Sequence, residues 1–195
     1  MALFPTLRFG LLLALTGAAV TSCISPPEFP DTPSIKFERL TVVRQPLSAP
    51  GALPVDSVIV TVSFEDGDGD LGLTPEEYSN PPYQRTNADG SLNPNHWNYF
   101  IRLFVRNPTS GQFEPYTLTP DNLSIPPDRY YSQFPHLEPN PDKEAPLQGD
   151  LRFGLTYTLG SPFYPGQEVR FEVSIKDREF HESNTVTTSS FLVVR

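Results

Sequence analysis

The stretch VDSVIVTVSFE at positions 55–65 decides the fold class. Val58, Val60, Val62 and Phe64 share one face of an extended chain, while threonine, serine and glutamate share the other. This alternation is the period of a half-buried β-strand. No helical period of useful length occurs anywhere in the sequence. The stretch therefore predicts an all-β protein whose strands each cover a core with one face.

Four further segments show the same alternation, and we also expect a short edge strand after the turn at 107–112 and a β-branched final strand. In the first of them the apolar positions change face between Phe37 and Leu40. Proline, at 23 of 195 residues, cannot donate to a strand ladder and therefore marks long loops over 80–94 and 119–146. The expected strands cover 35–45, 97–106, 113–118, 151–157, 169–175 and 184–194.

Strands with a single apolar face must pack against a second sheet. The number and length of the segments predict one immunoglobulin-like antiparallel β-sandwich of about seven strands with long proline-rich loops. The Cys-Trp-Cys core of true immunoglobulin domains is absent, because the chain has one cysteine. A jelly roll or a small barrel therefore also fits the pattern.

The first 22 residues have the features of an export signal. Arg8 supplies a positive charge, and the apolar run from Phe9 to Val20 is shorter than the roughly 20 residues that a spanning helix needs. The segment VTSC at 20–23 resembles the lipobox of bacterial lipoproteins. The resemblance implies cleavage before Cys23, transfer of a diacylglycerol to its thiol and acylation of its new amino group by a fatty acid such as palmitate. The alternative is an ordinary signal peptide followed by an unmodified cysteine.

The cysteine count favours lipidation. Cys23 is the one cysteine of the chain, so no disulfide can form within it, and lipidation leaves no free thiol outside the cytoplasm. We expect a membrane partner reached through this lipid, a proline-rich tether over 23–33 and a sandwich domain over 34–195. Ile24 stands where some bacterial lipoproteins carry an aspartate that retains them in the inner membrane. The expected location is therefore the cell envelope, on the outer membrane.

The charge balance excludes one class of partner. Lysine and arginine number 14 against 23 aspartates and glutamates, and the net charge is −9 at pH 7. Removal of Arg8 with the signal peptide makes the mature chain still more acidic. An acidic surface repels phosphate backbones and anionic lipid headgroups. We therefore expect no nucleic-acid partner, and lipid must hold the protein on its membrane.

The segment SFEDGDGDLGL at 63–73 carries the strongest chemical signal. Asp66, Asp68 and Asp70 alternate with glycines after a predicted strand, and the glycines allow the backbone to curl so that the carboxylates converge. Oxygen ligands at positions 1, 3 and 5 of a loop are typical of the start of a Ca²⁺ site. Counted from Asp66, the twelfth position, where an EF-hand has its bidentate acid, is Glu77.

The EF-hand pattern is incomplete. Its glycine position holds Leu71, with Gly72 one place later as a source of a carbonyl ligand, and a strand rather than a helix precedes the loop. Glu77 also has a competing role, because TPEE at 74–77 is the pattern of a helix cap in which Glu77 bonds back to Thr74. The alternative to a metal site is a solvated acidic turn.

The segment from Phe64 to Gly72 resembles a motif of small Gram-negative lipoproteins with one immunoglobulin-like domain. Their final hairpin has an aspartate, a polar turn and Ser-Asn before a Val/Thr-rich strand, which corresponds here to Asp177, Ser183 and Asn184. The turn departs from that pattern, because REFHE at 178–182 replaces the glycine and asparagine that are frequent there. Most such proteins have no assigned activity, so the resemblance implies a fold and a compartment.

Topology links the two loops. In an antiparallel sandwich the loops after the second and sixth strands share a pole, so Asp177 is expected to approach the aspartate loop. We hypothesise one Ca²⁺ held by Asp66, Asp68 and Asp70, with Asp177 or Glu77 as a further ligand. A missed strand would reverse the parity and separate the two loops.

The sequence shows no catalytic constellation. His96, His136 and His181 are far apart and lack paired metal-ligand spacing, so we expect them on the surface or in loops. No Gly-x-Ser-x-Gly elbow occurs. The chain is therefore expected to be no enzyme but an envelope module that binds a protein or a glycan, or serves as structure.

The alternative is a carbohydrate-active protein, either a glycan binder or a hydrolase with two carboxyl groups across a cleft. Aromatic side chains in or beside the long loops would form the binding platform of such a protein. A structural role in covering the sandwich is the competing explanation for these residues. They are Tyr78, Tyr83, Trp97, Tyr130, Tyr131 and Phe134.

Overall fold

The computed structural model describes residues 27–137 and 145–195, so the predicted signal peptide and Cys23 lie outside the described residues. This part of the chain contains eight strands and two short 3₁₀ helices. The strands are β1 (Ser34–Arg44), β2 (Val55–Asp66), β3 (Tyr99–Arg106), β4 (Phe113–Pro115), β5 (Leu147–Thr158), β6 (Glu168–Ile175), β7 (Val186–Thr187) and β8 (Phe191–Leu192). The 3₁₀ helices are η1 (Glu77–Ser79) and η2 (Pro94–His96).

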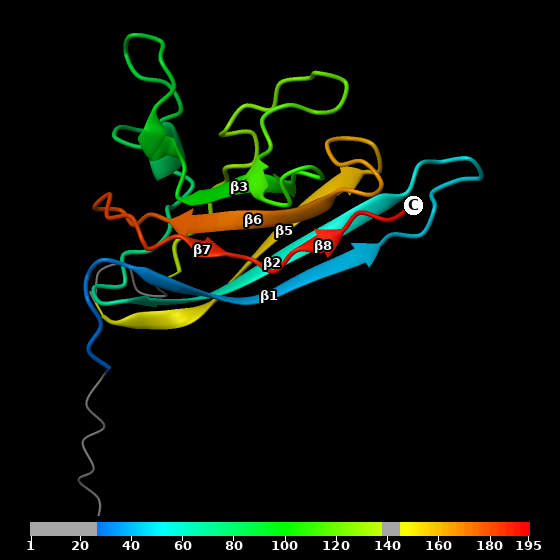
Figure 1. Cartoon of the computed structure of the whole chain (residues 1–195). Helices are drawn as coiled ribbons and strands as arrows, with labels where there is room; N and C mark the ends of the chain where they lie inside the picture. Colours follow the sequence, from blue (N-terminus) through cyan, green and yellow to red (C-terminus); the bar gives the residue numbers. More distant parts are fainter. Residues whose placement is uncertain (1–26, 138–144) are drawn as a thin grey trace, which may run out of the picture.

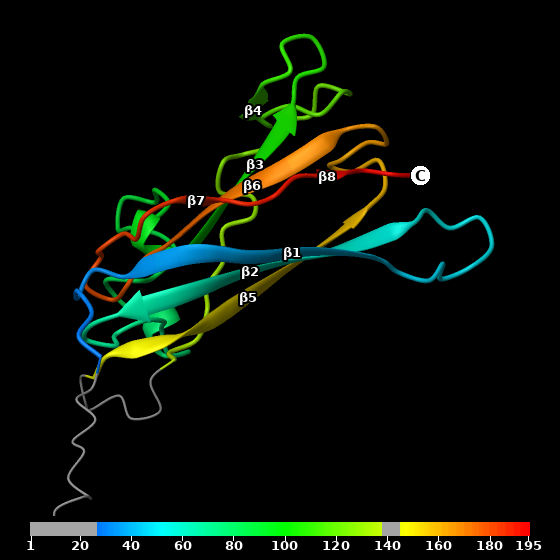
Figure 2. The ribbon, with the colours of Figure 1, turned by 60° about the horizontal axis from the view of Figure 1, so that its bottom comes forward.

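The strands form two antiparallel sheets that face each other (Figures 1 and 2). One sheet has the order β1-β2-β5, and the other has the order β4-β3-β6-β7, with β8 also paired to β6. The first, second and fifth strands thus share one sheet, as strands A, B and E do in the immunoglobulin fold. The predicted all-β sandwich is confirmed.

The core lies between the sheets and follows the alternation seen in the sequence. Val58, Val60 and Val62 of β2 are completely buried, and Val173 and Ile175 of β6 are completely buried in the facing sheet. Each such side chain contributes about 1.5–3 kcal/mol of burial free energy. Aromatic rings also span the two sheets, since Tyr99 of β3 stacks on Phe153 of β5 with ring centroids 4.6 Å apart.

Two details of the strands bear on the sequence predictions. The pairing of β1 with β2 shifts register between Phe37 and Arg39, which confirms the expected change of face. The predicted last strand over 184–194 is wrong in its continuity, because it forms β7 and β8 as two short strands on β6. Between them Thr188 takes the strand's place, accepting a 3.0 Å hydrogen bond from the Phe171 N–H with its hydroxyl oxygen.

The C-terminal segment closes one side of the sandwich against β1. The Asn184 side chain accepts from the Ile35 N–H and donates to the Ile35 carbonyl, both at 2.9 Å, so it replaces a strand partner. At the other end of β1, Arg44 forms an ion pair with the buried Asp56 and donates to the Val194 carbonyl at 2.7 Å. Asn184 thereby has a structural role in the final hairpin, as does Ser183, whose hydroxyl oxygen accepts from the Ile175 N–H at 3.0 Å.

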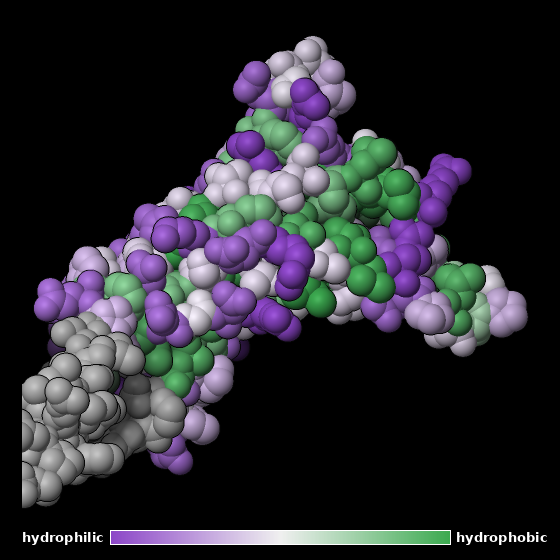
Figure 3. All heavy atoms as spheres, turned by 90° about the horizontal axis from the view of Figure 1, so that it is seen from below, coloured by the Kyte–Doolittle hydropathy of each residue, from purple (hydrophilic) through white to green (hydrophobic). Residues whose placement is uncertain are grey.

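The two poles of the sandwich differ in character. The segment 27–33, the aspartate loop after β2 and the turn after β6 lie at one pole (Figure 1). The uncharged hairpin 45–54 projects at the other pole and exposes Leu47 and Leu53, where Figure 3 shows hydrophobic side chains. Across 27–137 and 145–195, no helix has the length and hydropathy to cross a bilayer.

Candidate metal centre

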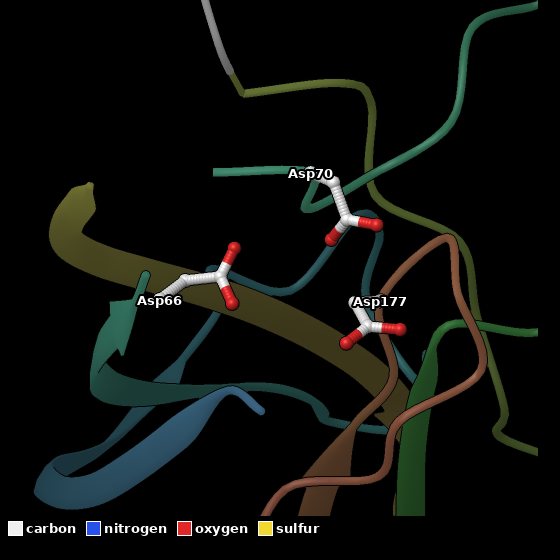
Figure 4. Close-up of side chains that lie close together, drawn as sticks. All are labelled: Asp66, Asp70 and Asp177. Atoms are coloured by element: carbon white, nitrogen blue, oxygen red, sulfur yellow. The ribbon is translucent and has the colours of Figure 1, made fainter. Parts of the chain in front are cut away.

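Three carboxylates converge at the pole that contains the aspartate loop. Asp66 ends β2, Asp70 lies in the loop that follows, and Asp177 comes just after β6. Each offers an oxygen that lies within 4.8 Å of the other two (Figure 4). Asp66 is completely buried, Asp177 is 4 % exposed and Asp70 is partly buried. The topology therefore brings together three of the five predicted metal ligands.

The carboxylates are short of hydrogen-bond donors. Both carboxylate oxygens of Asp66 are buried and have no hydrogen-bond partner among the described residues. The same is true of one oxygen of Asp70. A buried carboxylate without a partner costs several kcal/mol, because it loses hydration without compensation. The pair must therefore take up either protons or a cation.

The pKa values show the same electrostatic conflict. Burial, and after it the charges of Asp68, Asp70 and Asp177, together raise the pKa of Asp66 to about 7. Burial and, after it, the charge of Asp177 are the main causes that raise the pKa of Asp70 to about 7. Near neutral pH, these groups hold protons that a divalent cation can displace.

Asp177 differs from the other two because it has a donor of its own. Its Oδ1 accepts from the His181 N–H at 2.7 Å, and its Oδ2 lies 2.9 Å from His181 Nδ1. Burial raises the pKa of Asp177, and these contacts with His181 lower it. The sequence analysis missed this positioning role of His181, although the i, i+4 spacing of the two residues in a turn is its signal.

Glycines hold the aspartate loop in place because other backbone segments touch them. Gly69 and Gly72 have φ values of +73° and +88°, which L side chains rarely adopt. A Cβ at Gly69 would overlap the Ala145 carbonyl, and a Cβ at Gly72 would overlap the Pro135 carbonyl. The loop therefore needs glycine for close packing as well as for curvature.

Leu71 explains why the loop departs from the EF-hand pattern. Its side chain is completely buried in the core, so a glycine at this position would leave a cavity. Its carbonyl accepts from the Leu137 N–H at 3.0 Å, and the Leu73 N–H donates to the Phe134 carbonyl at 3.3 Å. The second half of the loop thus pairs with the segment 134–137 and does not wrap around an ion.

Glu77 and Asp68 lie outside the three-carboxylate cluster. Glu77 accepts from the Thr74 N–H at 2.7 Å and forms an ion pair with Arg178, and both interactions lower its pKa after burial has raised it. It therefore has the capping role that competed with metal binding. Asp68 is partly exposed, and its carbonyl accepts from the Ala145 N–H at 3.1 Å. Its charge still acts on Asp66 and Asp70.

The sequence predicted all three histidines on the surface or in loops, but His96 is not a surface residue. His96 is 8 % exposed, and its Nδ1 lies 2.9 Å from the Tyr83 carbonyl oxygen. It ends η2, where it packs edge to face with Trp97 at 4.5 Å between centroids. His136 lies beside Arg178, with 3.1 Å between Nε2 and Nη1.

Some of the loop aromatic residues form a second feature. Trp97, Phe100 and Tyr131 line a surface hollow of about 230 Å³ together with Asp128. The Phe100 and Tyr131 rings pack edge to face with centroids 5.0 Å apart. The other candidates are structural: Phe134 is buried and Tyr130 packs on the core, while the Tyr78 and Tyr83 hydroxyls donate to the carbonyls of Phe134 and Arg178.

Comparisons with protein-family models, curated proteins and solved structures gave no match.

Proposed function

We propose that this protein is a lipid-anchored module of the bacterial cell envelope, without enzymatic activity, whose tether-bearing pole is closed by one Ca²⁺. Asp66, Asp70 and Asp177 hold the ion. The observation that carries the proposal is the complete burial of Asp66 with both carboxylate oxygens unpartnered among the described residues. The bound ion joins β2 to the turn after β6 and thereby stabilises the sandwich.

The ligand set favours calcium over softer metals. All three side chains are carboxylates, and hard oxygen ligands suit Ca²⁺, Mg²⁺ and Mn²⁺ rather than Zn²⁺ or copper. Ca²⁺ accepts irregular geometry with mixed carboxylate, carbonyl and water ligands, whereas Mg²⁺ demands a near-ideal octahedron. A site assembled from a strand end, a loop and a turn therefore suits Ca²⁺ best.

The burial of the cluster supports a structural rather than a catalytic ion. The Asp177 side chain is fully shielded from solvent, as is Asp66. A catalytic metal keeps an open coordination position for water or substrate. The lipobox at 20–23 and the absence of any other cysteine support the anchor.

Thermal unfolding of the full-length protein in detergent tests the calcium site. At a Ca²⁺ concentration about 100 times Kd, linkage gives about 2.7 kcal/mol of stabilisation, which raises Tm by about 5–10 °C. Asp66→Asn should remove this rise. Asp150→Asn is the matched control, since Asp150 is an exposed aspartate on β5 outside the cluster, and it should keep the full rise. An unchanged Tm of the wild-type protein in calcium would refute the proposal.

The surface hollow favours a second candidate function, glycan binding. Aromatic faces stack on the apolar faces of sugar rings, and Asp128, which also lines the hollow, offers a carboxylate acceptor for hydroxyl groups. Trp97 is the one tryptophan of the chain, so its fluorescence reports on this hollow alone. A saturable change in emission with envelope oligosaccharides, lost in Asp128→Ala, would support this function, and constant emission would exclude it for the sugars tested.

A further inference from the structure

The predicted tether touches the aspartate loop at the residue between two of its acids. The Gly67 N–H donates a hydrogen bond of 2.9 Å to the Pro30 carbonyl. A Cβ at Gly67 would overlap the Phe29 carbonyl oxygen, so the tether backbone passes directly over this glycine. Phe29 is partly buried, while its neighbour Glu28 is exposed.

From this contact we infer that Ca²⁺ binding controls the docking of the tether on the domain, an inference that rests on the proposed calcium site. Gly67 follows the buried ligand Asp66 directly, so the two residues share a peptide plane that moves as a unit. When the ion leaves, nothing links Asp66 to Asp70 and Asp177, and the loop relaxes. This movement withdraws the Gly67 N–H from Pro30.

The coupling is reciprocal by thermodynamic linkage. A docked tether holds Gly67 where Asp66 faces Asp70 and Asp177, and it thereby raises the affinity for Ca²⁺. Within the described part of the chain, the bond to Gly67 is the hydrogen bond that joins the segment 27–32 to the domain. Its release frees a proline-rich segment of about 20 Å in extended form. Calcium thus sets how far the domain can move from its membrane.

Cleavage after Glu28 by a glutamate-specific protease measures the docking, because a protease needs a locally released chain. The substrate is full-length lipoprotein in detergent, with Ca²⁺ or with EGTA, and calorimetry on the same samples measures Ca²⁺ binding. We expect cleavage after Glu28 to be at least about tenfold slower in calcium. Tryptic cleavage after Arg85, which is exposed in the loop between η1 and η2, should not respond to calcium.

A pair of glycine variants separates tether docking from ion binding. Gly67→Ala should abolish the slow cleavage in calcium, because the new Cβ displaces Phe29, while the three ligands remain. Gly154→Ala is the matched control, since a Cβ there meets nothing within 4 Å, and it should behave like the wild type. If Gly67→Ala does not fold, Asp70→Asn replaces it, with rapid cleavage after Glu28 expected in both calcium and EGTA.

Two outcomes overturn the inference, and they differ in what they leave standing. Calcium binding by calorimetry with equal cleavage rates at Glu28 would disprove the coupling and leave the proposed function intact. Absence of binding heat at millimolar calcium would disprove the proposed function and the coupling with it.

Discussion

Asp66 and Asp177 come from opposite sheets of the sandwich, and their carboxylate oxygens lie within 4.8 Å of each other. Asp66 is the last residue of β2, and Asp177 follows the end of β6. Like charges at this separation repel strongly where water is excluded. In the proposed site, a calcium ion between them would convert this repulsion into a link between the two sheets, and the predictions below follow from this relationship.

The Ca²⁺ affinities of variants that each lack one carboxylate should show which acidic residues bind the ion. Asp66→Asn should weaken Ca²⁺ binding by about 100-fold or more, because it removes one of three charges from the cluster. Glu77→Gln should change the affinity less than about threefold, because Glu77 binds Thr74 and Arg178. Calorimetric titration of both variants checks this, and an equal loss of affinity in the two would place Glu77 at the ion.

The metal-free protein should lose stability as pH rises. The pKa values of Asp66 and Asp70 are raised to about 7 from 3.8, so the folded state binds these protons more tightly than the unfolded state. Their stabilising contribution is complete below about pH 4 and is lost as pH rises through about 7. We therefore expect Tm to fall from about pH 5 to about pH 8 without calcium.

Saturating calcium should oppose this trend, because the ion replaces the protons as pH rises. The difference in Tm between calcium-loaded and metal-free protein should therefore grow with pH. Asp66→Asn should show a weaker pH dependence without metal, since it removes one of the two groups with strongly raised pKa. A wild-type Tm that rises from about pH 5 to about pH 8 in metal-free buffer would contradict the raised pKa values of Asp66 and Asp70.

Alanine substitutions at two glycines with similar φ values should distinguish the cost of backbone strain from the cost of a steric overlap. Gly72 has φ +88° and faces the Pro135 carbonyl, whereas Gly160 has φ +91° and open space at its Cβ position. Gly160→Ala should cost about 1–2 kcal/mol from conformation alone. Gly72→Ala should cost about 3 kcal/mol or more, because the backbone at Pro135 must also move. Urea unfolding measures both, and equal costs would show that the contact at Gly72 is unimportant.

The Asn184 side chain should stabilise the fold independently of calcium. Asn184→Ala leaves the Ile35 N–H and carbonyl without their side-chain partner and should cost about 1–2 kcal/mol. Thr185→Ala, at the exposed neighbouring position, should cost less than about 0.5 kcal/mol. Calcium affinity should be unchanged in both variants, and a loss confined to Asn184→Ala would connect the hairpin to the ion site.

The sandwich was predictable because apolar and polar residues alternate along β2, β3 and β6 and thereby indicate which face of each strand is buried. The shared pole of Asp66 and Asp177 was also predictable, because antiparallel strands fix the parity of their ends. The breaks in the last strand were not, since Thr188 replaces a backbone bond with a side-chain bond that β-branched composition does not reveal.

Within the candidate site, spacing alone misled the assignment of Glu77. Position 12 of an EF-hand is a ligand only if the loop wraps around the ion, and here Leu71 enters the core and turns the chain away. The contact of Asp177 with His181 depends on a tight turn with Phe180 at φ 71°, which sequence patterns do not specify. The contact of Gly67 with Pro30 likewise arises from tertiary packing.

A crystal structure of calcium-loaded protein, with anomalous diffraction from the ion, tests the metal centre most directly. We expect one anomalous peak with oxygens of Asp66, Asp70 and Asp177 at about 2.3–2.6 Å. Absence of a peak among these three carboxylates at millimolar calcium, with Asp66 and Asp70 sharing a proton or turned apart, would contradict the proposal.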